Sequence, residues 1–268
     1  MELRPLGRTG LRVSALGLGS VKLGRSEQVK YPLGFVIPDD VAARELLELA
    51  WDLGINLIDT APAYGNAEER LGQLLPHPHD WVVVTKVGES FTGGQSHFDF
   101  SATATRESVE RSLRRLRRDH LDVVLVHSDG DDMRIIHEEP VLDTLAELKR
   151  EGLVRAYGMS TKTVEGGLWV VEYCDVVMAT CNLADTHDLP VIEAAHRHNT
   201  GVLVKKGLQS GHADASVGGA GVEASVRYVF SHAGVSSMIV GTINPGHLRD
   251  NVALTRRVLS ELAAGASR

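Results

Sequence analysis

The sequence predicts an α/β fold, a (β/α)8 TIM barrel with an N-terminal β-hairpin. Short apolar runs rich in Val, Ile and Leu recur along the chain, and amphipathic segments separate them. This alternation is typical of parallel strands that are buried on both faces and joined by crossover helices. The chain has 268 residues, a length at which such barrels commonly form one domain. We therefore expect one barrel domain over residues 1–268.

Apolar runs with the length and β-branched composition of buried strands are the candidate barrel strands. A closed barrel of this kind needs eight of them, each followed by a helix. The candidate runs are Val13–Gly17, Leu57–Asp59, Val82–Lys86, Val123–His127, Ala156–Met159, Val176–Thr180, Val202–Lys205 and Met238–Gly241.

Capping residues and glycines mark the ends of the intervening helices. The expected helices run from Asp39 or Asp40 to Leu53, from Ser101 onwards, over Pro140–Arg150 and over Leu189–His198. Before the first strand, Leu3–Val13 has the pattern of a hairpin with Gly7-Arg8-Thr9-Gly10 at its turn. We expect this hairpin to close the barrel floor.

The charge of the chain argues against nucleic-acid binding. The formal net charge is -7, whereas phosphate binding needs a basic face. The densest basic cluster, Arg111–Arg118, is interleaved with leucines at helical spacing and follows Glu107 and Glu110. This pattern indicates a solvated helix face with ion pairs four residues apart.

Cysteine and histidine usage favours a cytoplasmic protein without a metal site. Cys174 and Cys181 lie beside apolar runs without paired spacing, so we expect inert, buried thiols. His77 and His79 precede a strand, which places them on the stabilising face of the barrel. No apolar stretch approaches the roughly 20 residues that span a bilayer, so no membrane partner is expected.

Reactive side chains stand where the predicted strands end. The stretch Asn56–Gly65 is an apolar run that stops at Asp59 and is followed by Tyr64. Lys86 and His127 end the next two strands. Catalytic residues of such barrels come from the carboxyl ends of several strands, so these side chains should meet on one rim. A charged residue after so apolar a strand is costly unless it is paired or functional.

These residues give the chain a family resemblance. Asp-Thr-Ala-x-x-Tyr-Gly at 59–65, Thr-Lys at 85–86, Val-His at 126–127 and Gly-Met-Ser at 158–160 stand in order. With them, the chain resembles an aldo-keto reductase from its Leu-Gly-Arg-Thr-Gly opening to Asn-Pro-Gly-His-Leu-Arg-Asp-Asn near its C-terminus. The resemblance implies an oxidoreductase that transfers a hydride between a nicotinamide dinucleotide and a small aldehyde, ketone or sugar.

The chemistry of hydride transfer supports the same four residues. A carbonyl that accepts hydride develops negative charge on oxygen and needs a proton. Free Tyr has a pKa of about 10, so a neighbouring ammonium is needed to stabilise its anion. We therefore assign Tyr64 as general acid, Lys86 as the group that tunes it, Asp59 as the anchor of Lys86, and His127 as the substrate orienter.

Cofactor contacts follow from the resemblance alone, since no Rossmann glycine motif follows a strand. Ser160 and Asn182 are expected near the nicotinamide carboxamide, and Lys205 near a phosphate or an acidic substrate group. The phosphate and adenine end is assigned to Gly241, Thr242, Asn244, His247, Asp250 and Asn251, at a helix start that favours an anion. The family favours NADP(H) over NAD(H), with His247 and Arg249 as the nearby cations.

Three positions depart from the family pattern: Thr161 replaces an asparagine, Met178 a glutamine, and Lys205 an aromatic residue that stacks on nicotinamide. Loop residues that could line a substrate pocket, or pack locally, are Tyr31, Phe35, Phe91, Phe98, Met133 and Ile136. The opening resembles a branch with aldose dehydrogenases, which favours a small sugar or simple aldehyde.

Two other functions fit parts of the pattern. Lys86, Lys205 and Lys206 lie near strand ends, where a desolvated lysine forms Schiff bases, as in a lyase. The Asp59 partner argues against this for Lys86, because it keeps the amine charged. The substitutions at Met178 and Lys205 favour instead a non-catalytic module that binds the dinucleotide without turnover.

Overall fold

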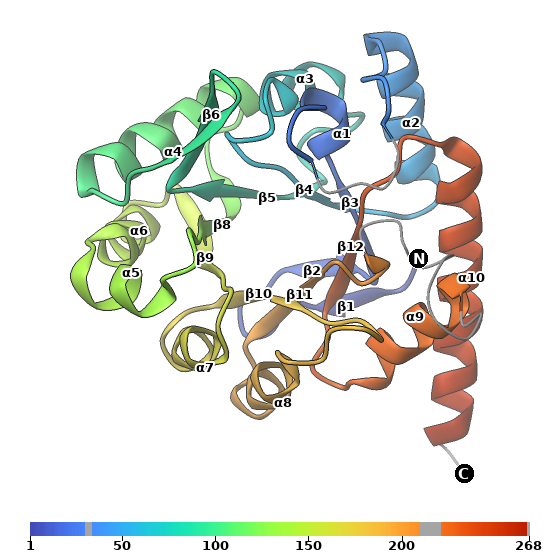
Figure 1. The fold of residues 1–268 in the computed structure, drawn as a ribbon. Helices are drawn as coiled ribbons and strands as arrows, with labels where there is room; N and C mark the ends of the chain where they lie inside the picture. The colour runs from blue at the N-terminus through green and yellow to red at the C-terminus, as the bar shows by residue number, and fades with distance from the viewer. Residues whose placement is uncertain (30–33, 210–220, 267–268) are drawn as a thin grey trace.

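A closed barrel of parallel strands forms the centre of the molecule (Figure 1). The computed structural model describes residues 1–29, 34–209 and 221–266. Met238 and Leu16 pair across β12 and β3 and so close the ring. The barrel strands are β3 (Leu16–Gly19), β4 (Leu57–Asp59), β5 (Val82–Val87), β8 (Leu121–His127), β9 (Val154–Ser160), β10 (Val176–Thr180), β11 (Gly201–Lys205) and β12 (Ser237–Val240). The predicted fold class is confirmed.

Helices surround the barrel and connect its strands (Figure 1). They are α2 (Asp40–Asp52), α3 (Ala67–Leu74), α4 (Ala102–Leu116), α6 (Val141–Arg150), α7 (Val164–Tyr173), α8 (Leu189–His198), α9 (Gly221–Ser231) and α10 (Pro245–Ala266), with the short α1 (Val21–Gly24) and α5 (Asp132–Glu138) in loops. The side chain of Asp39 accepts a hydrogen bond from Ala42 N, and that of Ser101 from Ala104 N. Both predicted N-caps are therefore confirmed.

The N-terminal hairpin closes the barrel floor, as predicted. Its strands β1 (Leu3–Pro5) and β2 (Arg12–Ser14) are antiparallel. Leu6, Leu11 and Val13 are buried in one cluster with the inward-facing side chains of the barrel strands. The hairpin therefore supplies the apolar surface that fills the bottom of the barrel.

The predicted start of the first barrel strand at Val13 is wrong. Val13 belongs to the hairpin, and β3 begins at Leu16. Ser14 N donates to Asn56 Oδ1 at 2.7 Å, and Asn56 N donates to Ser14 Oγ at 3.1 Å. These bonds fix the chain between the end of β2 and the start of β3. The apolar run contains residues of both strands, and composition alone does not show where one ends and the other begins.

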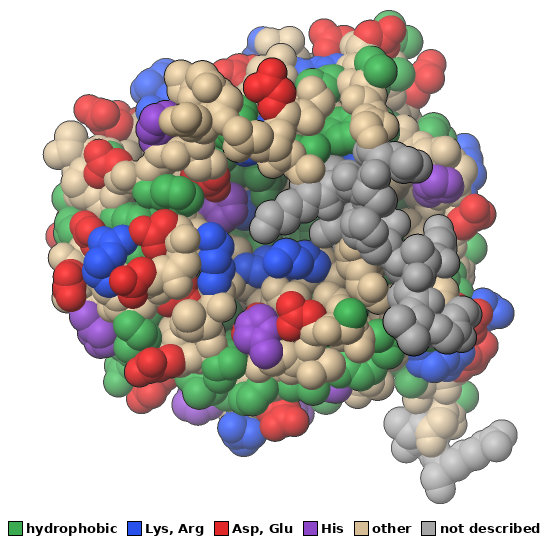
Figure 2. Space-filling model, viewed as in Figure 1, with side chains coloured by type: hydrophobic (Ala, Val, Ile, Leu, Met, Phe, Trp, Pro, Cys, Tyr) green, Lys and Arg blue, Asp and Glu red, His purple; other side chains and the backbone are tan. Residues whose placement is uncertain are grey.

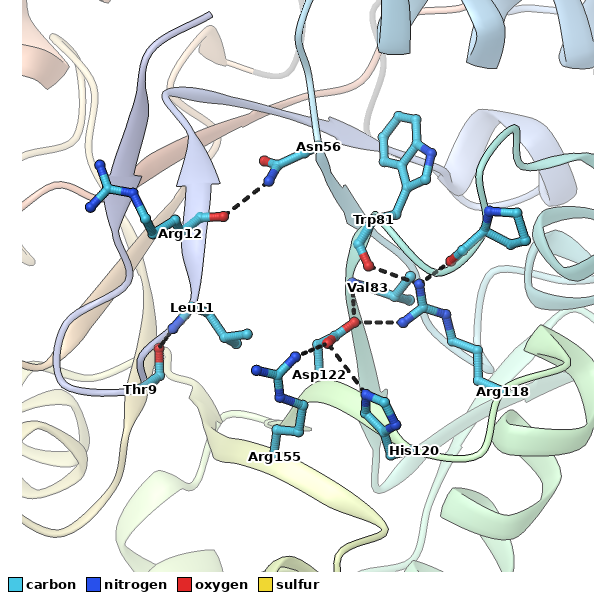
Figure 3. Close-up of polar contacts among 11 residues, drawn as sticks. Thr9, Leu11, Arg12, Asn56, Trp81, Val83, Arg118, His120, Asp122 and Arg155 are labelled. Atoms are coloured by element: carbon cyan, nitrogen blue, oxygen red, sulfur yellow. Dashed lines mark hydrogen bonds and ion pairs between the residues drawn. The ribbon is translucent and has the colours of Figure 1, made fainter.

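A buried ion-pair cluster lies at the amino ends of β8 and β9 (Figure 3). Arg118 Nη1 lies 2.6 Å from Asp122 Oδ2, with only 5% and 4% of the two side chains exposed. Arg155 Nη1 donates to the other oxygen of Asp122 at 3.1 Å. The prediction of a solvated face over Arg111–Arg118 is therefore wrong for Arg118. A buried carboxylate needs cationic partners, and Arg118 is one of them.

A second hairpin, absent from the predicted elements, follows β5. It consists of β6 (Glu89–Thr92) and β7 (Gln95–Phe98). Its two-residue turn is Gly93-Gly94, with φ of 61° and 76°. Two successive positive φ angles are the geometry that a tight hairpin turn requires and that glycine adopts without strain. The hairpin rises from the carboxyl end of a barrel strand, which is the predicted catalytic rim.

Two cysteines flank β10, with Cys174 before the strand and Cys181 after it. Cys174 and Cys181 are free and buried, and burial raises the pKa of each thiol to about 12. His77 and His79 are exposed between α3 and β5. Across residues 1–29, 34–209 and 221–266, no three His, Cys, Asp or Glu side chains form a metal-binding group. Within the same ranges, every helix is too short or too polar to cross a bilayer.

Candidate active site

Adjacent strands bring the predicted acid, amine and imidazole together. β4, β5 and β8 are neighbours in the barrel. Asp59 is the last residue of β4, Lys86 stands one residue before the end of β5, and His127 ends β8. Since the strands are parallel, these positions share the carboxyl-terminal rim. Basic and histidine side chains gather near the centre of the face in Figure 2.

Lys86 and Asp59 form a buried ion pair. Lys86 Nζ lies 2.6 Å from Asp59 Oδ1, and the exposed fractions of the side chains are 2% and 7%. The ammonium also donates to the carbonyl of Thr60 at 2.8 Å. Burial disfavours the charged amine, but the charges of Asp59 and Tyr64 outweigh it and raise the pKa of Lys86. Lys86 is therefore cationic at neutral pH.

Tyr64 lies against this pair. Lys86 Nζ is 4.8 Å from the centre of the Tyr64 ring. Burial raises the pKa of Tyr64 above its ordinary value, and Asp59 adds to the increase, while Lys86 partly opposes both. The phenol is consequently neutral at physiological pH, which is the form that donates a proton.

Two glycines allow the Tyr64 loop to pack against α1. Gly65 has a φ of +63°, and a Cβ there would lie 2.0 Å from the carbonyl oxygen of Gly24. A Cβ on Gly24 would lie 2.3 Å from the carbonyl oxygen of Tyr64. Since neither position has room for a side chain, the Tyr-Gly dipeptide has a packing role as well as a chemical one.

His127 lies edge-on to Tyr64 and beside a carboxylate from the second hairpin. The Tyr64 and His127 ring centres are 6.3 Å apart, with an interplanar angle of 87°. His127 Nδ1 is 2.5 Å from Glu89 Oε2, although the two groups are not aligned as a regular hydrogen bond. Ser96 Oγ donates to Glu89 Oε1 at 2.6 Å and so holds the carboxylate across the hairpin.

Neighbouring charges and burial shift the pKa values of Glu89 and His127. Burial raises the pKa of Glu89, but His127, Ser96 and Arg25 outweigh it and lower that pKa to about 2. Burial lowers the pKa of His127, Lys86 and Lys205 lower it further, and Glu89 opposes them. Sequence reasoning missed Glu89. Its signal was the Gly93-Gly94 turn, which predicts a hairpin that begins directly after the Lys86 strand.

Two of the predicted cofactor residues, Ser160 and Lys205, lie beside His127. Ser160 is the register partner of His127 across β8 and β9. Lys205 Nζ donates to Ser160 Oγ at 2.9 Å and to the Thr161 carbonyl at 2.6 Å. Asn182, buried after β10, donates to the carbonyl of Lys206 at 3.1 Å. Burial lowers the pKa of Lys205 to about 8, and neighbouring lysines add to the decrease.

The remaining predicted cofactor residues lie at the end of β12 and the start of α10. Thr242 Oγ1 accepts from Asn244 N at 3.1 Å. Asn244 Oδ1 accepts from Gly246 N at 2.8 Å and from His247 N at 3.2 Å. The helix predicted to start here begins at Pro245, and Asn244 caps it with its side chain. Gly241, Thr242, Asn244 and His247 lie within this capped turn, and Asp250 and Asn251 follow one turn later.

Most of the candidate pocket residues have local partners. Arg25 stacks on Phe91, with its guanidinium carbon 3.4 Å from the ring centre. Phe98 stacks on Phe100 at 6.1 Å between ring centres. Lys22 lies over Phe35 at 5.2 Å. Ile136 is buried, and Met133 packs against the core. Tyr31 lies outside the described residues, and Met178 is buried in the cluster that fills the barrel floor.

Comparison with known proteins decides the family. The model of the Aldo/keto reductase family matches residues 15–218. The chain belongs to this family. This family comprises oxidoreductases that use nicotinamide cofactors. The predicted resemblance of the chain to an aldo-keto reductase is thereby confirmed.

Two dehydrogenases are similar to parts of the chain. It is 35% identical over 195 residues to L-galactose dehydrogenase of Arabidopsis thaliana, covering 68% of this chain and 57% of that protein. It is 32% identical over 165 residues to D-arabinose 1-dehydrogenase of Saccharomyces cerevisiae, covering 54% and 47% respectively. The chain therefore spans about half the length of these curated relatives.

A solved structure is similar over nearly the whole chain. A protein of Pseudomonas aeruginosa, described as an aldo-keto reductase, is 56% identical, with a TM-score of 0.87 and coverage of 96% of this chain and 95% of that one. An aldo-keto reductase of Bacillus halodurans is 24% identical with a TM-score of 0.79, which shows the shared fold.

Proposed function

We propose that this aldo/keto reductase transfers a hydride between NADP(H) and the carbonyl or alcohol carbon of a small aldehyde, ketone or sugar. The observation that supports this most directly is the buried contact of Lys86 with Asp59, beside a neutral Tyr64. Delivery of a proton to a developing oxyanion requires an acid and a positive charge that stabilises the anion left behind. Tyr64 and Lys86 supply these two groups.

Each member of the tetrad has a distinct task in this proposal. Tyr64 donates its phenolic proton to the carbonyl oxygen in reduction and accepts a proton in oxidation. Lys86 stabilises the phenolate that remains, and Asp59 keeps Lys86 charged and oriented. His127 contacts the substrate oxygen from the opposite side and fixes its angle. A bound nicotinamide dinucleotide supplies or accepts the hydride, because no protein side chain carries one.

The residues on the other half of the rim suit a dinucleotide. Ser160 Oγ accepts from Lys205 and keeps its own proton for a ligand. Thr161 Oγ1 is buried without a hydrogen-bond partner among the described residues. In our proposal Ser160 and Asn182 hold the carboxamide, and Lys205 binds a phosphate or an acidic substrate group. Residues 241–251, at the N-terminus of α10, hold the phosphate and adenine end.

The preference for NADP(H) over NAD(H) rests on cations near that helix start. A 2′-phosphate needs a positive partner, and His247 and Arg249 stand in the first two turns of α10. One similar protein, from Escherichia coli, is named as an NADH-specific methylglyoxal reductase; it is 32% identical over 201 residues. The cofactor preference of this chain should therefore be tested with both NADPH and NADH.

Fluorescence titration with NADPH and NADH, on the wild type and on Tyr64→Phe, tests the proposal. Both proteins should bind the nucleotide, with a tighter Kd for NADPH, and only the wild type should turn over an aldehyde. We expect Tyr64→Phe to lower kcat by roughly 10²-fold to 10⁴-fold, the range for a general acid. Saturable binding without turnover by the wild type would favour the non-catalytic module.

A lysine-dependent lyase is the second candidate, and the lowered pKa of Lys205 is what favours it. An amine with a pKa of about 8 is partly neutral under physiological conditions and so able to attack a carbonyl. Borohydride trapping of an aldehyde on the wild type and on Lys205→Met distinguishes the two. Covalent trapping on the wild type alone would support the lyase.

A further inference from the structure

A pocket at the floor of the barrel is a feature of the molecule that the proposed function does not use. This floor pocket has a volume of about 240 Å³ and is lined by residues of β1, of the end of α8 with the turn into β11, and of the α9–β12 connection. Asn199 and Ser236 line it and stand shortly before β11 and β12, on the face opposite the catalytic rim. The proposed catalytic and cofactor residues lie elsewhere, so a ligand in the floor pocket would not compete with them.

Arg4 brings an unpaired charge to the floor pocket. It lies on β1 and is half-buried, and its guanidinium carbon is 5.5 Å from the centre of the Phe230 ring. Its Nη1 is buried without a hydrogen-bond partner among the described residues. Burial lowers the pKa of Arg4, and the charge of Glu2 partly opposes the decrease. An arginine keeps its charge in a protein, so a guanidinium in this position is stabilised by an anion that reaches it.

Polar groups from two other segments line the same pocket. Ser236 Oγ accepts from Val202 N at 3.3 Å, so its own proton stays available to a ligand. Asn199 has a φ of 52° at the end of α8, and its side-chain amide is exposed. With Arg4, these donors come from three separate segments of the chain. Donors spread in this way suit the several oxygens of a tetrahedral oxyanion better than the two coplanar oxygens of a carboxylate.

Close packing of the walls forms the floor pocket before any ligand arrives. A Cβ on Gly7 would lie 2.2 Å from Gly201 N, and Gly7 has a φ of +53°. A Cβ on Gly234 would lie 2.5 Å from the carbonyl oxygen of Ile192. The hairpin therefore meets the start of β11, and the α9–β12 connection meets α8, with no room for a side chain between them. A preformed pocket binds its ligand at a lower entropic cost.

We propose that the floor pocket binds a small phosphate, either the inorganic ion or the phosphoryl group of a short monoester, with Arg4 as its anchor. An arginine fork donates two parallel hydrogen bonds to one phosphate. The volume lies below the roughly 300–1,000 Å³ of pockets for drug-sized ligands, which favours a small ligand. The inference goes beyond the proposed function, since the apolar interior of the barrel separates the floor pocket from the catalytic rim.

Isothermal titration calorimetry with inorganic phosphate, in the presence of NADPH, tests the floor pocket directly. The wild type should bind one phosphate per chain, and Arg4→Met should weaken that binding by about 10-fold to 100-fold, the worth of a charge-assisted hydrogen bond. Arg12→Met is the matched control, because Arg12 lies on the other strand of the hairpin, outside the pocket, and donates to the Leu3 carbonyl at 2.6 Å. It should keep the wild-type affinity. Absence of phosphate binding by the wild type would overturn the inference.

Two further ligands identify the chemistry that the pocket takes. Glycerol 3-phosphate should bind if the pocket takes the phosphoryl group of a monoester, and binding of the inorganic ion alone assigns free phosphate. Acetate should bind more weakly than either. Equal or tighter binding of acetate would overturn the choice of phosphate.

Thermal unfolding provides a second measurement, because a ligand of the folded chain raises its Tm. Phosphate also stabilises proteins in general by being excluded from their surface, so the result is the difference between variants. Phosphate should raise the Tm of the wild type and of Arg12→Met more than that of Arg4→Met. Arg4→Lys keeps the charge without the planar fork and should show an intermediate increase, which guards against misfolding of Arg4→Met. Equal increases in all four proteins would overturn the inference.

NADPH separates this inference from the proposed function. If NADPH abolishes phosphate binding and Arg4→Met retains it, the phosphate lies on the catalytic rim and the floor pocket is refuted, while cofactor binding stands. If NADPH does not bind at all, the proposed cofactor fails, and the comparison of Arg4→Met with Arg12→Met still decides the floor pocket.

Discussion

Lys86 Nζ and Asp59 Oδ1 lie 2.6 Å apart in a part of the barrel where the exposed fraction of neither side chain exceeds 7%. Two charges so deeply buried lose their hydration, and their mutual attraction does not always repay that loss. The presence of this ion pair in the barrel is therefore explained better by a role in catalysis than by a contribution to stability, because it places a permanent cation beside Tyr64. This distinction leads to a prediction about variants that remove one charge or both.

Asp59→Ala should lower the free energy of unfolding by roughly 3–5 kcal/mol, since it leaves the Lys86 ammonium buried without its carboxylate. The double variant Asp59→Ala/Lys86→Met should be more stable than Asp59→Ala, because it removes the unpaired charge as well. Urea unfolding of the wild type, the two single variants and the double variant measures this order. A double variant less stable than both singles would contradict the prediction.

The raised pKa of Tyr64 predicts a one-sided pH dependence. Below pH 10 the phenol keeps its proton, so ionisation of Tyr64 should cause no loss of reduction in the neutral range. Oxidation needs the phenolate, so its kcat/KM should keep rising with pH through the alkaline range. The difference in tyrosinate ultraviolet absorbance between the wild type and Tyr64→Phe gives the pKa directly. A midpoint below that of free tyrosine would show that Lys86 outweighs burial.

Lys205 supplies a cation whose charge depends on pH near neutrality. Its pKa is lowered to about 8, so the ammonium is present below that pH and is lost as the pH rises through it. Affinity for the group that it binds should weaken above pH 8 in the wild type. Lys205→Met should weaken that affinity at pH 7 by about 10-fold to 100-fold, the worth of a charge-assisted hydrogen bond, and abolish the alkaline decrease.

Two ligands and one control variant identify that group. A change in the Kd of NADPH would assign Lys205 to a cofactor phosphate, and a change in the KM of glyoxylate would assign it to an acidic substrate group. Lys162→Met, at an exposed lysine on the same rim, should leave both constants unchanged. If Lys205→Met also left both unchanged, its proposed role in anion binding would be refuted.

The sequence predicted the barrel and the four rim residues because both follow from local patterns. Apolar runs that end in Asp59, Lys86 and His127 are visible in single segments, and parallel strands put their ends together. Glu89 was missed because its place beside His127 depends on a contact between an inserted hairpin and a different strand. The burial of Arg118 was missed for a similar reason. The spacing of charged residues predicts that its side chain faces solvent, and only the folded structure shows its buried ion pair with Asp122.

Gly158 provides a test of how the strands hold Ser160 in place. A Cβ at Gly158 would lie 1.6 Å from the carbonyl oxygen of Val176, its register partner on β10. Gly158→Ala must therefore push β9 and β10 apart, two residues before Ser160. We expect it to lower the free energy of unfolding by about 3 kcal/mol or more, the upper part of the range for overpacking.

The same variant should weaken nucleotide binding if Ser160 and Lys205 act as proposed, because Ser160 ends β9, which the clash displaces, and Lys205 is hydrogen-bonded to Ser160. Gly265→Ala is the matched control: a Cβ there meets nothing within 4 Å, and alanine favours its helix by about 1 kcal/mol or less. Urea unfolding and NADPH titration of both variants measure the two effects. Wild-type stability in Gly158→Ala would mean that β9 and β10 are not so closely packed. Wild-type affinity despite lowered stability would place the carboxamide away from Ser160.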